Sequence, residues 1–213
     1  MWQSISYYAA LAGEALLGVF GIRVYEEPRY EVIERIGDRV EIRRYAPRLA
    51  AEVDLASPGE AGRSEAFQLL FAYIAGANRA SVAGSDNIAM TMPVELAGKQ
   101  RLAMTVPVQT SEAAGDRHMR FFLPAKYQRD TAPKPADPRV RLVTASEGTI
   151  ATLRFSGTGG DRDIRQRQAE LTERLAAARW RPTSEPYVLF YDAPFTLPFL
   201  RRNEVAVAVE PIG

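Results

Sequence analysis

Apolar and polar side chains alternate in short runs along most of the chain after Pro28. In the first half the runs cover residues 30–34, 40–45 and 49–53, and in the second half residues 140–146, 149–156, 187–191 and 204–209. Alternation with a period of two residues is typical of β-strands that bury one face. The pattern therefore predicts a protein rich in strands.

The most regular alternation lies in residues 88–110, which carry nearly the same motif twice. Residues 90–94 read Met-Thr-Met-Pro-Val and residues 104–108 read Met-Thr-Val-Pro-Val, with a polar tetrapeptide between them. Two such runs around a short loop that contains glycine predict a β-hairpin. Its apolar face either completes the core or presents adaptable methionine side chains to a flat apolar ligand.

Apolar residues first recur with the spacing of an α-helix after residue 57. Ser57 is the expected N-cap, Pro58 the first-turn residue, and Glu60 the partner that completes a capping box. The helix is expected to run to about Ala75 and to end at Gly76. Its apolar stripe consists of Phe67, Leu70, Phe71 and Ile74.

A second helix is predicted from Asp161, the expected N-cap, to about Ala178. Arginines recur between residues 162 and 181, but acidic residues are interleaved with them, so we interpret them as a solvated face rather than a nucleic-acid interface. Strands, a helix and further strands thus occur twice. This order predicts one α+β domain with two pseudo-symmetric halves.

Composition excludes several kinds of chemistry. The 213 residues include 27 basic and 26 acidic side chains, so no strong overall charge attracts nucleic acid or an anionic membrane. There is no cysteine, which excludes disulfides, thiolate nucleophiles and cysteine-bound metals. His118 is the one histidine, interpreted here as a surface residue, and no G-x-S-x-G motif accompanies it. Neither a two-histidine metal site nor a hydrolytic triad is expected.

The first residues form a separate apolar segment. Residues 5–24 are mostly apolar, but Glu14 lies near the middle, where a carboxylate in a membrane span costs roughly 2.5–3.5 kcal/mol. We therefore predict that residues 1–27 form a helix that docks on the protein or on a membrane surface, ahead of a domain at residues 28–213. A cytoplasmic location, with peripheral membrane contact through residues 1–25 as an open alternative, is expected.

Four stretches together resemble the SOUL haem-binding protein family. They are residues 30–32 with 40–45, residues 73–78, residues 88–94, and residues 191–194 leading to 201–205. The resemblance implies a distorted β-barrel of two pseudo-equivalent halves, each a mostly antiparallel sheet with a packed helix. It also implies non-covalent binding of haem or another tetrapyrrole, with no catalytic activity generally established.

The resemblance also implies a place for the ligand, in a hydrophobic groove between the first long helix and the loop before the last strand. The candidate contacts are Phe67, Leu70, Phe71 and Ile74 of the helix and Phe195, Leu197, Phe199 and Leu200 of the loop. The residues alone leave two interpretations of this apolar loop, which either folds onto the core or forms a ligand wall.

Arginines are the natural partners of the two porphyrin carboxylates. Arg201, Arg202 and Arg63 flank the two apolar elements and are the candidates here. Some family members carry basic residues in the first helix, whereas this chain has Ser64 and Ala72 there. No axial iron ligand, metal site or catalytic residue is assigned.

Two other functions stay open. The chain could be a small-molecule-binding or hydrolytic module like the gyrase-inhibitor-like domains, in which Glu204 would act as a general base. It could also be a membrane-surface interaction protein that docks through residues 1–25.

Overall fold

The computed structural model describes residues 26–79, 107–113, 116–192 and 196–213. Within them the alternating runs form strands β1 (Tyr30–Ile36), β2 (Val40–Tyr45), β3 (Arg48–Asp54), β4 (Asn78–Arg79), β5 (Val108–Ala113), β6 (Asp116–Phe122), β7 (Lys134–Pro135), β8 (Arg141–Ala145), β9 (Gly148–Phe155), β10 (Trp180–Pro182), β11 (Tyr187–Phe190) and β12 (Asn203–Pro211). The helices are α2 (Gly59–Ile74) and α3 (Asp161–Ala176), and a 3₁₀ turn, η1, covers Pro198–Leu200.

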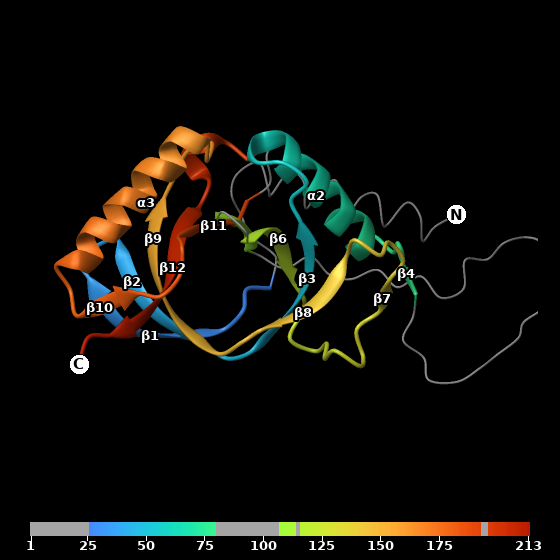
Figure 1. Ribbon diagram of the computed structural model, residues 1–213, viewed down its shortest axis with the longest axis horizontal. Helices are drawn as coiled ribbons and strands as arrows, with labels where there is room; N and C mark the ends of the chain where they lie inside the picture. Colours follow the sequence, from blue (N-terminus) through green and yellow to red (C-terminus); the bar gives the residue numbers. More distant parts are fainter. Residues whose placement is uncertain (1–25, 80–106, 114–115, 193–195) are drawn as a thin grey trace, which may run out of the picture.

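The described strands form one antiparallel sheet and a small ribbon. The sheet order is β1-β2-β9-β12-β11-β5-β6-β3-β8, with β10 paired to β12, while β4 pairs with β7. The sheet curls strongly, as Figure 1 shows, and β1 and β8 are the two ends of this path. The α+β class is therefore confirmed, with the sheet curled into a half-barrel.

The predicted pseudo-symmetry is visible in the strand order. Read outward from the central β11–β5 pair, β11-β12-β9-β2 on one side matches β5-β6-β3-β8 on the other. One strand of each half therefore lies in the sheet of the other half, since β2 pairs with β9 and β8 pairs with β3. Because the halves exchange strands, they share one continuous sheet.

Both helices cover the same face of the sheet, one over each half (Figure 1). Leu171 and Leu175 of α3 pack with the apolar residues of β2, β9 and β12. Leu70 and Tyr73 of α2 pack with those of β3 and β6. The opposite face, called here the helix-free face, carries Tyr45, Gln109, Phe122, Leu189 and Glu204, all buried by the curl of the sheet.

Two predictions about the helix starts are wrong. The N-cap of α2 is Pro58, and the N-cap of α3 is Gly160, with no side-chain cap bond at either. At α2 the chain folds back onto the first helical turn, so the Ser57 carbonyl lies against Gly62 instead of Ser57 capping the helix. The predicted stop at Gly76 is confirmed, because this glycine has a positive φ of 110°.

Gly62 is expected to tolerate no side chain. A Cβ atom at this position would lie 1.8 Å from the Ser57 carbonyl oxygen. Gly62→Ala should therefore lower the free energy of unfolding by about 1–3 kcal/mol through overpacking, although alanine favours helix. Urea unfolding followed by circular dichroism measures the change. Gly148→Ala is the matched control, because its nearest atom would be 4.0 Å away, and equal stability of the two variants would contradict the prediction.

Two predicted segments lie outside the described residues. They are the N-terminal helix, up to Tyr25, and most of the doubled hairpin, of which the described part starts at Pro107. Both stay predictions. Among the helices that the structure describes, none is long and apolar enough to cross a membrane.

Candidate functional site

The predicted apolar stripe of α2 divides between the core and the surface. Leu70 is fully buried and Ile74 is 6% exposed, and both belong to the core beneath the helix. Phe71 is 48% exposed and Phe67 is half-buried. Their rings are stacked, with centroids 6.0 Å apart and planes 13° apart, and Phe67 rests edge-on against Phe121 of β6. The outer flank of α2 thus presents a paired aromatic surface.

The described part of the predicted apolar loop, residues 196–200, forms a turn held by hydrogen bonds. The amide of Gly157 donates to the Pro198 carbonyl at 2.9 Å, and Arg201 Nε donates to the Thr196 carbonyl at 2.7 Å. These bonds leave Phe199 71% exposed and Leu200 37% exposed. Leu197 is half-buried. Phe195 lies outside the described residues.

The structure brings the turn and the N-terminal end of α2 to the same corner of the molecule. Arg63 of α2 forms an ion pair of 2.8 Å with Asp161, the first residue of α3. Gly157, just before α3, holds the turn at Pro198. Among the described residues, the exposed large apolar side chains are Tyr30, Phe71, Phe199, Leu200 and Ile212, so three of the five lie on these two elements.

The three candidate arginines have different environments. Arg201 and Arg63 lie beside the corner, where Arg201 binds the turn and Arg63 binds Asp161. Arg202 has other partners, and its side chain is 12% exposed. Its guanidinium pairs with Glu204 at 2.8 Å and Glu27 at 3.2 Å, and it lies 3.8 Å from the centroid of the Tyr191 ring. Arg202 therefore belongs to an interior network.

That network surrounds the fully buried carboxylate of Glu204. Arg43 of β2 donates to both of its oxygens, at 2.7 and 3.1 Å. The Tyr191 hydroxyl donates at 2.8 Å and Arg202 Nε at 2.9 Å. Burial alone would raise the pKa of Glu204, but these hydrogen bonds and the charges of Arg43 and Arg202 outweigh it and lower the pKa.

Such an arrangement disfavours a catalytic role for Glu204. A general base needs a lone pair within reach of its substrate and a pKa near the working pH. The Glu204 carboxylate is sealed from solvent, accepts hydrogen bonds from three side chains and has a lowered pKa. The geometry instead makes it a link between β2, β12 and Tyr191, the residue that follows β11.

Sequence reasoning missed the rest of this polar interior. On the helix-free face a row of residues in register crosses the sheet in the order Glu52, Arg120, Gln109, Leu189, Glu204 and Arg154. Arg120 and Glu204 thus hold equivalent places in the two halves, with opposite charges, and Arg120 binds Glu52. The available signal was a charged residue within an apolar run of a strand, as at Glu52, which follows Leu49, Ala50 and Ala51 in β3.

The interpretation of His118 as a surface residue is wrong. It is 4% exposed and lies on the helix-free face of β6, opposite Ser111. Met119 and Phe121 take the helix-covered face, so alternation turns His118 to the other face, which the curl of the sheet buries.

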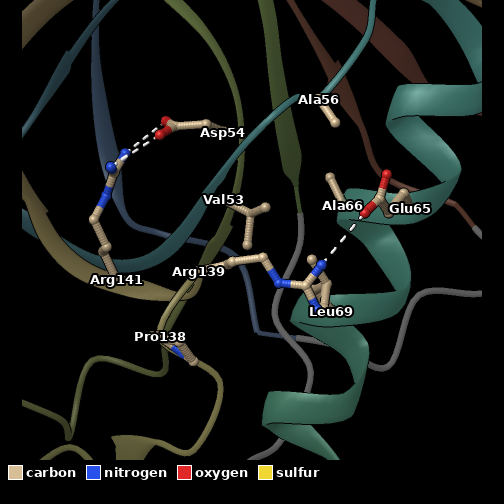
Figure 2. A pocket seen from close by; sticks show the side chains of 9 residues that line it. All are labelled: Val53, Asp54, Ala56, Glu65, Ala66, Leu69, Pro138, Arg139 and Arg141. Carbon is tan, nitrogen blue, oxygen red and sulfur yellow. Dashed lines mark hydrogen bonds and ion pairs between the residues drawn. The ribbon is translucent and has the colours of Figure 1, made fainter.

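A separate cavity of about 250 Å³ lies on the other flank of α2, toward β8 (Figure 2). Leu69, Ala66 and Val53 form its apolar part. Its arginines are already paired with carboxylates: Arg139 with Asp137 and Glu65, and Arg141 with Asp54. Its volume is below the roughly 300–1,000 Å³ of drug-sized ligand sites, so it does not fit a porphyrin.

The exposed side chains on α2 and on the turn fit the apolar part of a porphyrin in their chemistry. Aromatic and aliphatic groups match a flat apolar face, and Arg63 and Arg201 lie at the start of α2 and at the turn. Neither α2 nor residues 193–202 contain histidine, cysteine or methionine. In the described part of the chain no three histidine, aspartate or glutamate residues group as a metal site. The fit is therefore to the macrocycle rather than to its iron.

Known folds resemble this one at low sequence identity, and no curated protein sequence matches the chain. The C-terminal domain of EcmrR has a TM-score of 0.55 at 10% identity, covering 85% of this chain and 98% of that chain. An uncharacterized conserved protein and a hydrolase, both from Listeria innocua, have TM-scores of 0.52 and 0.51 at 15% and 16% identity, each covering 81% of this chain and 92% of that chain. These similarities confirm the fold and nothing finer.

The family assignment rests on a match of nearly the whole domain. The family model described as SOUL heme-binding protein matches residues 25–208, which include α2, the 3₁₀ turn and all strands up to most of β12. Membership supports binding of haem or a related tetrapyrrole in general terms. The chain belongs to the SOUL heme-binding protein family.

Proposed function

We propose that this protein binds haem or a related tetrapyrrole, without a covalent bond, on the corner formed by the outer flank of α2 and the turn at residues 197–200. The observation that carries the proposal is the exposure of Phe71, Phe199 and Leu200, which lie on these two elements. Large apolar side chains left exposed near one another mark surfaces that bind a ligand or partner.

The stacked pair of Phe67 and Phe71 supports a flat ligand. Its aromatic face would meet one side of the macrocycle, while the turn would meet it from the α3 side. Because the turn is held by hydrogen bonds before the ligand arrives, little ordering opposes binding. Candidate contacts are therefore Phe67, Phe71, Leu197, Phe199 and Leu200, while Leu70 and Ile74 support them from the core.

The two arginines beside the corner would serve the ligand's carboxylates. Arg63 and Arg201 carry guanidinium groups there, and such groups bind carboxylates through charge-assisted hydrogen bonds. Arg202, held by Glu204 and Glu27, would contribute by fixing the strand that follows the turn. A carrier or buffer of a tetrapyrrole is the role that this open, non-covalent arrangement fits.

Binding through the macrocycle predicts that iron is dispensable. Haemin and iron-free protoporphyrin IX should each bind at one equivalent, with affinities within about threefold, a difference of about 0.7 kcal/mol. Absorbance titration of the Soret band and quenching of porphyrin fluorescence measure the two affinities. Binding of haemin alone would show that the iron is ligated. Absence of binding by both, with folded protein, would refute the proposed function.

A further inference from the structure

Arg48, the first residue of β3, lies on the helix-free face against two aromatic rings. Its guanidinium carbon is 3.9 Å from the centroid of the Tyr45 ring and 4.6 Å from that of the Phe122 ring. These rings belong to β2 and β6, so three strands fix the position of one cation. Such contacts stabilise a guanidinium but do not neutralise its charge.

Arg48 differs from the neighbouring arginines in having no carboxylate. On the same side of the sheet, Arg43 and Arg202 bind Glu204, and Arg120 binds Glu52. Within the described residues, Arg48 forms no ion pair and donates no hydrogen bond, and its Nε is buried without an acceptor. Nε is the one nitrogen of this side chain that is sealed in this way, so the two Nη groups keep access to solvent.

The surroundings make this charge unfavourable when it is left alone. Burial lowers the pKa of Arg48, and the positive charge of Arg120 lowers it further. The nearby groups that would raise the pKa of Arg48 are the phenols of Tyr45, Tyr187 and Tyr191. These phenols stay neutral because burial raises their own pKa values. A guanidinium that is partly buried and has no anion is costly, and such features are found where a ligand supplies the missing charge.

We propose that Arg48 anchors a binding site for a small aromatic carboxylate on the helix-free face. The two accessible Nη groups form the fork that a planar carboxylate matches with two parallel hydrogen bonds. The buried rings of Tyr45 and Phe122 lie against the guanidinium and hold it in place, and the half-buried Tyr187 beside it provides an apolar neighbour for an aromatic body. This site is distinct from the tetrapyrrole corner, because α2 lies on the opposite face of the sheet.

Benzoate and benzamide, which differ in charge but hardly in shape, test the proposal on the full chain. Saturation-transfer NMR should show benzoate binding at least about tenfold tighter than benzamide, and benzoate should raise the melting temperature. Arg48→Gln, which keeps the length of the side chain but removes its charge, should weaken benzoate binding by at least about tenfold and abolish the thermal shift. Arg48→Lys, with the charge but without the fork, should bind with intermediate affinity.

Phe71→Asp separates this site from the tetrapyrrole corner. The variant should bind benzoate as the parent protein does, while Arg48→Gln should bind haemin as the parent does. Benzoate binding that survives Arg48→Gln, or that is lost in Phe71→Asp, would overturn the proposal, as would no benzoate binding by the folded parent protein. Circular dichroism establishes that each variant is folded.

Discussion

Glu204→Gln is expected to lower the free energy of unfolding by about 3–5 kcal/mol, because it leaves two arginines without their buried counter-charge. Arg43 is 4% exposed and Arg202 12% exposed, and both depend on the Glu204 carboxylate. A glutamine side chain has nearly the same volume, so packing changes little and the loss reports the charge. Urea unfolding followed by circular dichroism measures it.

Glu210→Gln is the matched control on the same strand. Glu210 pairs with Arg181, and the two side chains are 47% and 70% exposed. An exposed pair of this kind contributes only about 0.2–1 kcal/mol. Similar stability losses in the two variants would contradict the importance assigned to the buried network.

Acid should reduce the difference in the free energy of unfolding between the parent protein and Glu204→Gln. The pKa of Glu204 is lowered in the folded state, so the unfolded chain binds its proton more readily than the folded chain does. The stabilisation is therefore complete above the unfolded-state pKa of about 4.3 and is lost as the pH falls through the folded-state pKa. Urea unfolding at a series of pH values should show a difference in the free energy of unfolding that is constant near neutrality and shrinks in acid. A difference that stays the same at all pH values would contradict this prediction.

Phe71→Asp is expected to weaken haemin binding by at least about tenfold, or about 1.4 kcal/mol. The variant removes an aromatic face from the tetrapyrrole corner and places a negative charge where a ligand with two carboxylates would bind. Because Phe71 is 48% exposed, the fold should lose little stability. Soret titration measures the affinity.

Ile212→Asp provides the control for that variant. Ile212 is also a large exposed apolar residue, at 55%, but it follows β12 near the C-terminus rather than lying on α2 or the turn. It should leave haemin binding unchanged. Equal affinities of Phe71→Asp and the parent protein would refute the placement of the ligand, though not the family.

Local sequence signals predicted the elements well. Period-two runs marked the strands on each side of the sheet, and the helical stripe with Gly76 marked the body and end of α2. These features depend on contacts within a few residues, so they are readable without a fold. The predictions of the helix starts failed because an N-cap depends on the path of the preceding chain, as the contact of Ser57 with Gly62 shows.

The candidate site was predicted only in part. Periodicity placed Phe67, Leu70, Phe71 and Ile74 on one stripe, but the small residues Gly62 and Ala66 take part in the face that meets the sheet. The helix is therefore rotated so that Phe67 and Phe71 lie at its flank while Leu70 and Ile74 enter the core. A stripe wider than the contact with the sheet does not reveal which of its edges stays exposed.

The sequence by itself determined the strand and helix pattern, the repeat of two halves and the family of this protein. Only the tertiary structure decided which polar residues are buried and with whom they pair. Arg43 and Glu204 lie 161 residues apart and meet because β2 crosses into the sheet of the other half. His118 and Arg48 are buried or desolvated because the sheet curls over its helix-free face. Periodicity assigns a side chain to a face of its strand, but the curvature of the whole sheet decides whether that face meets water.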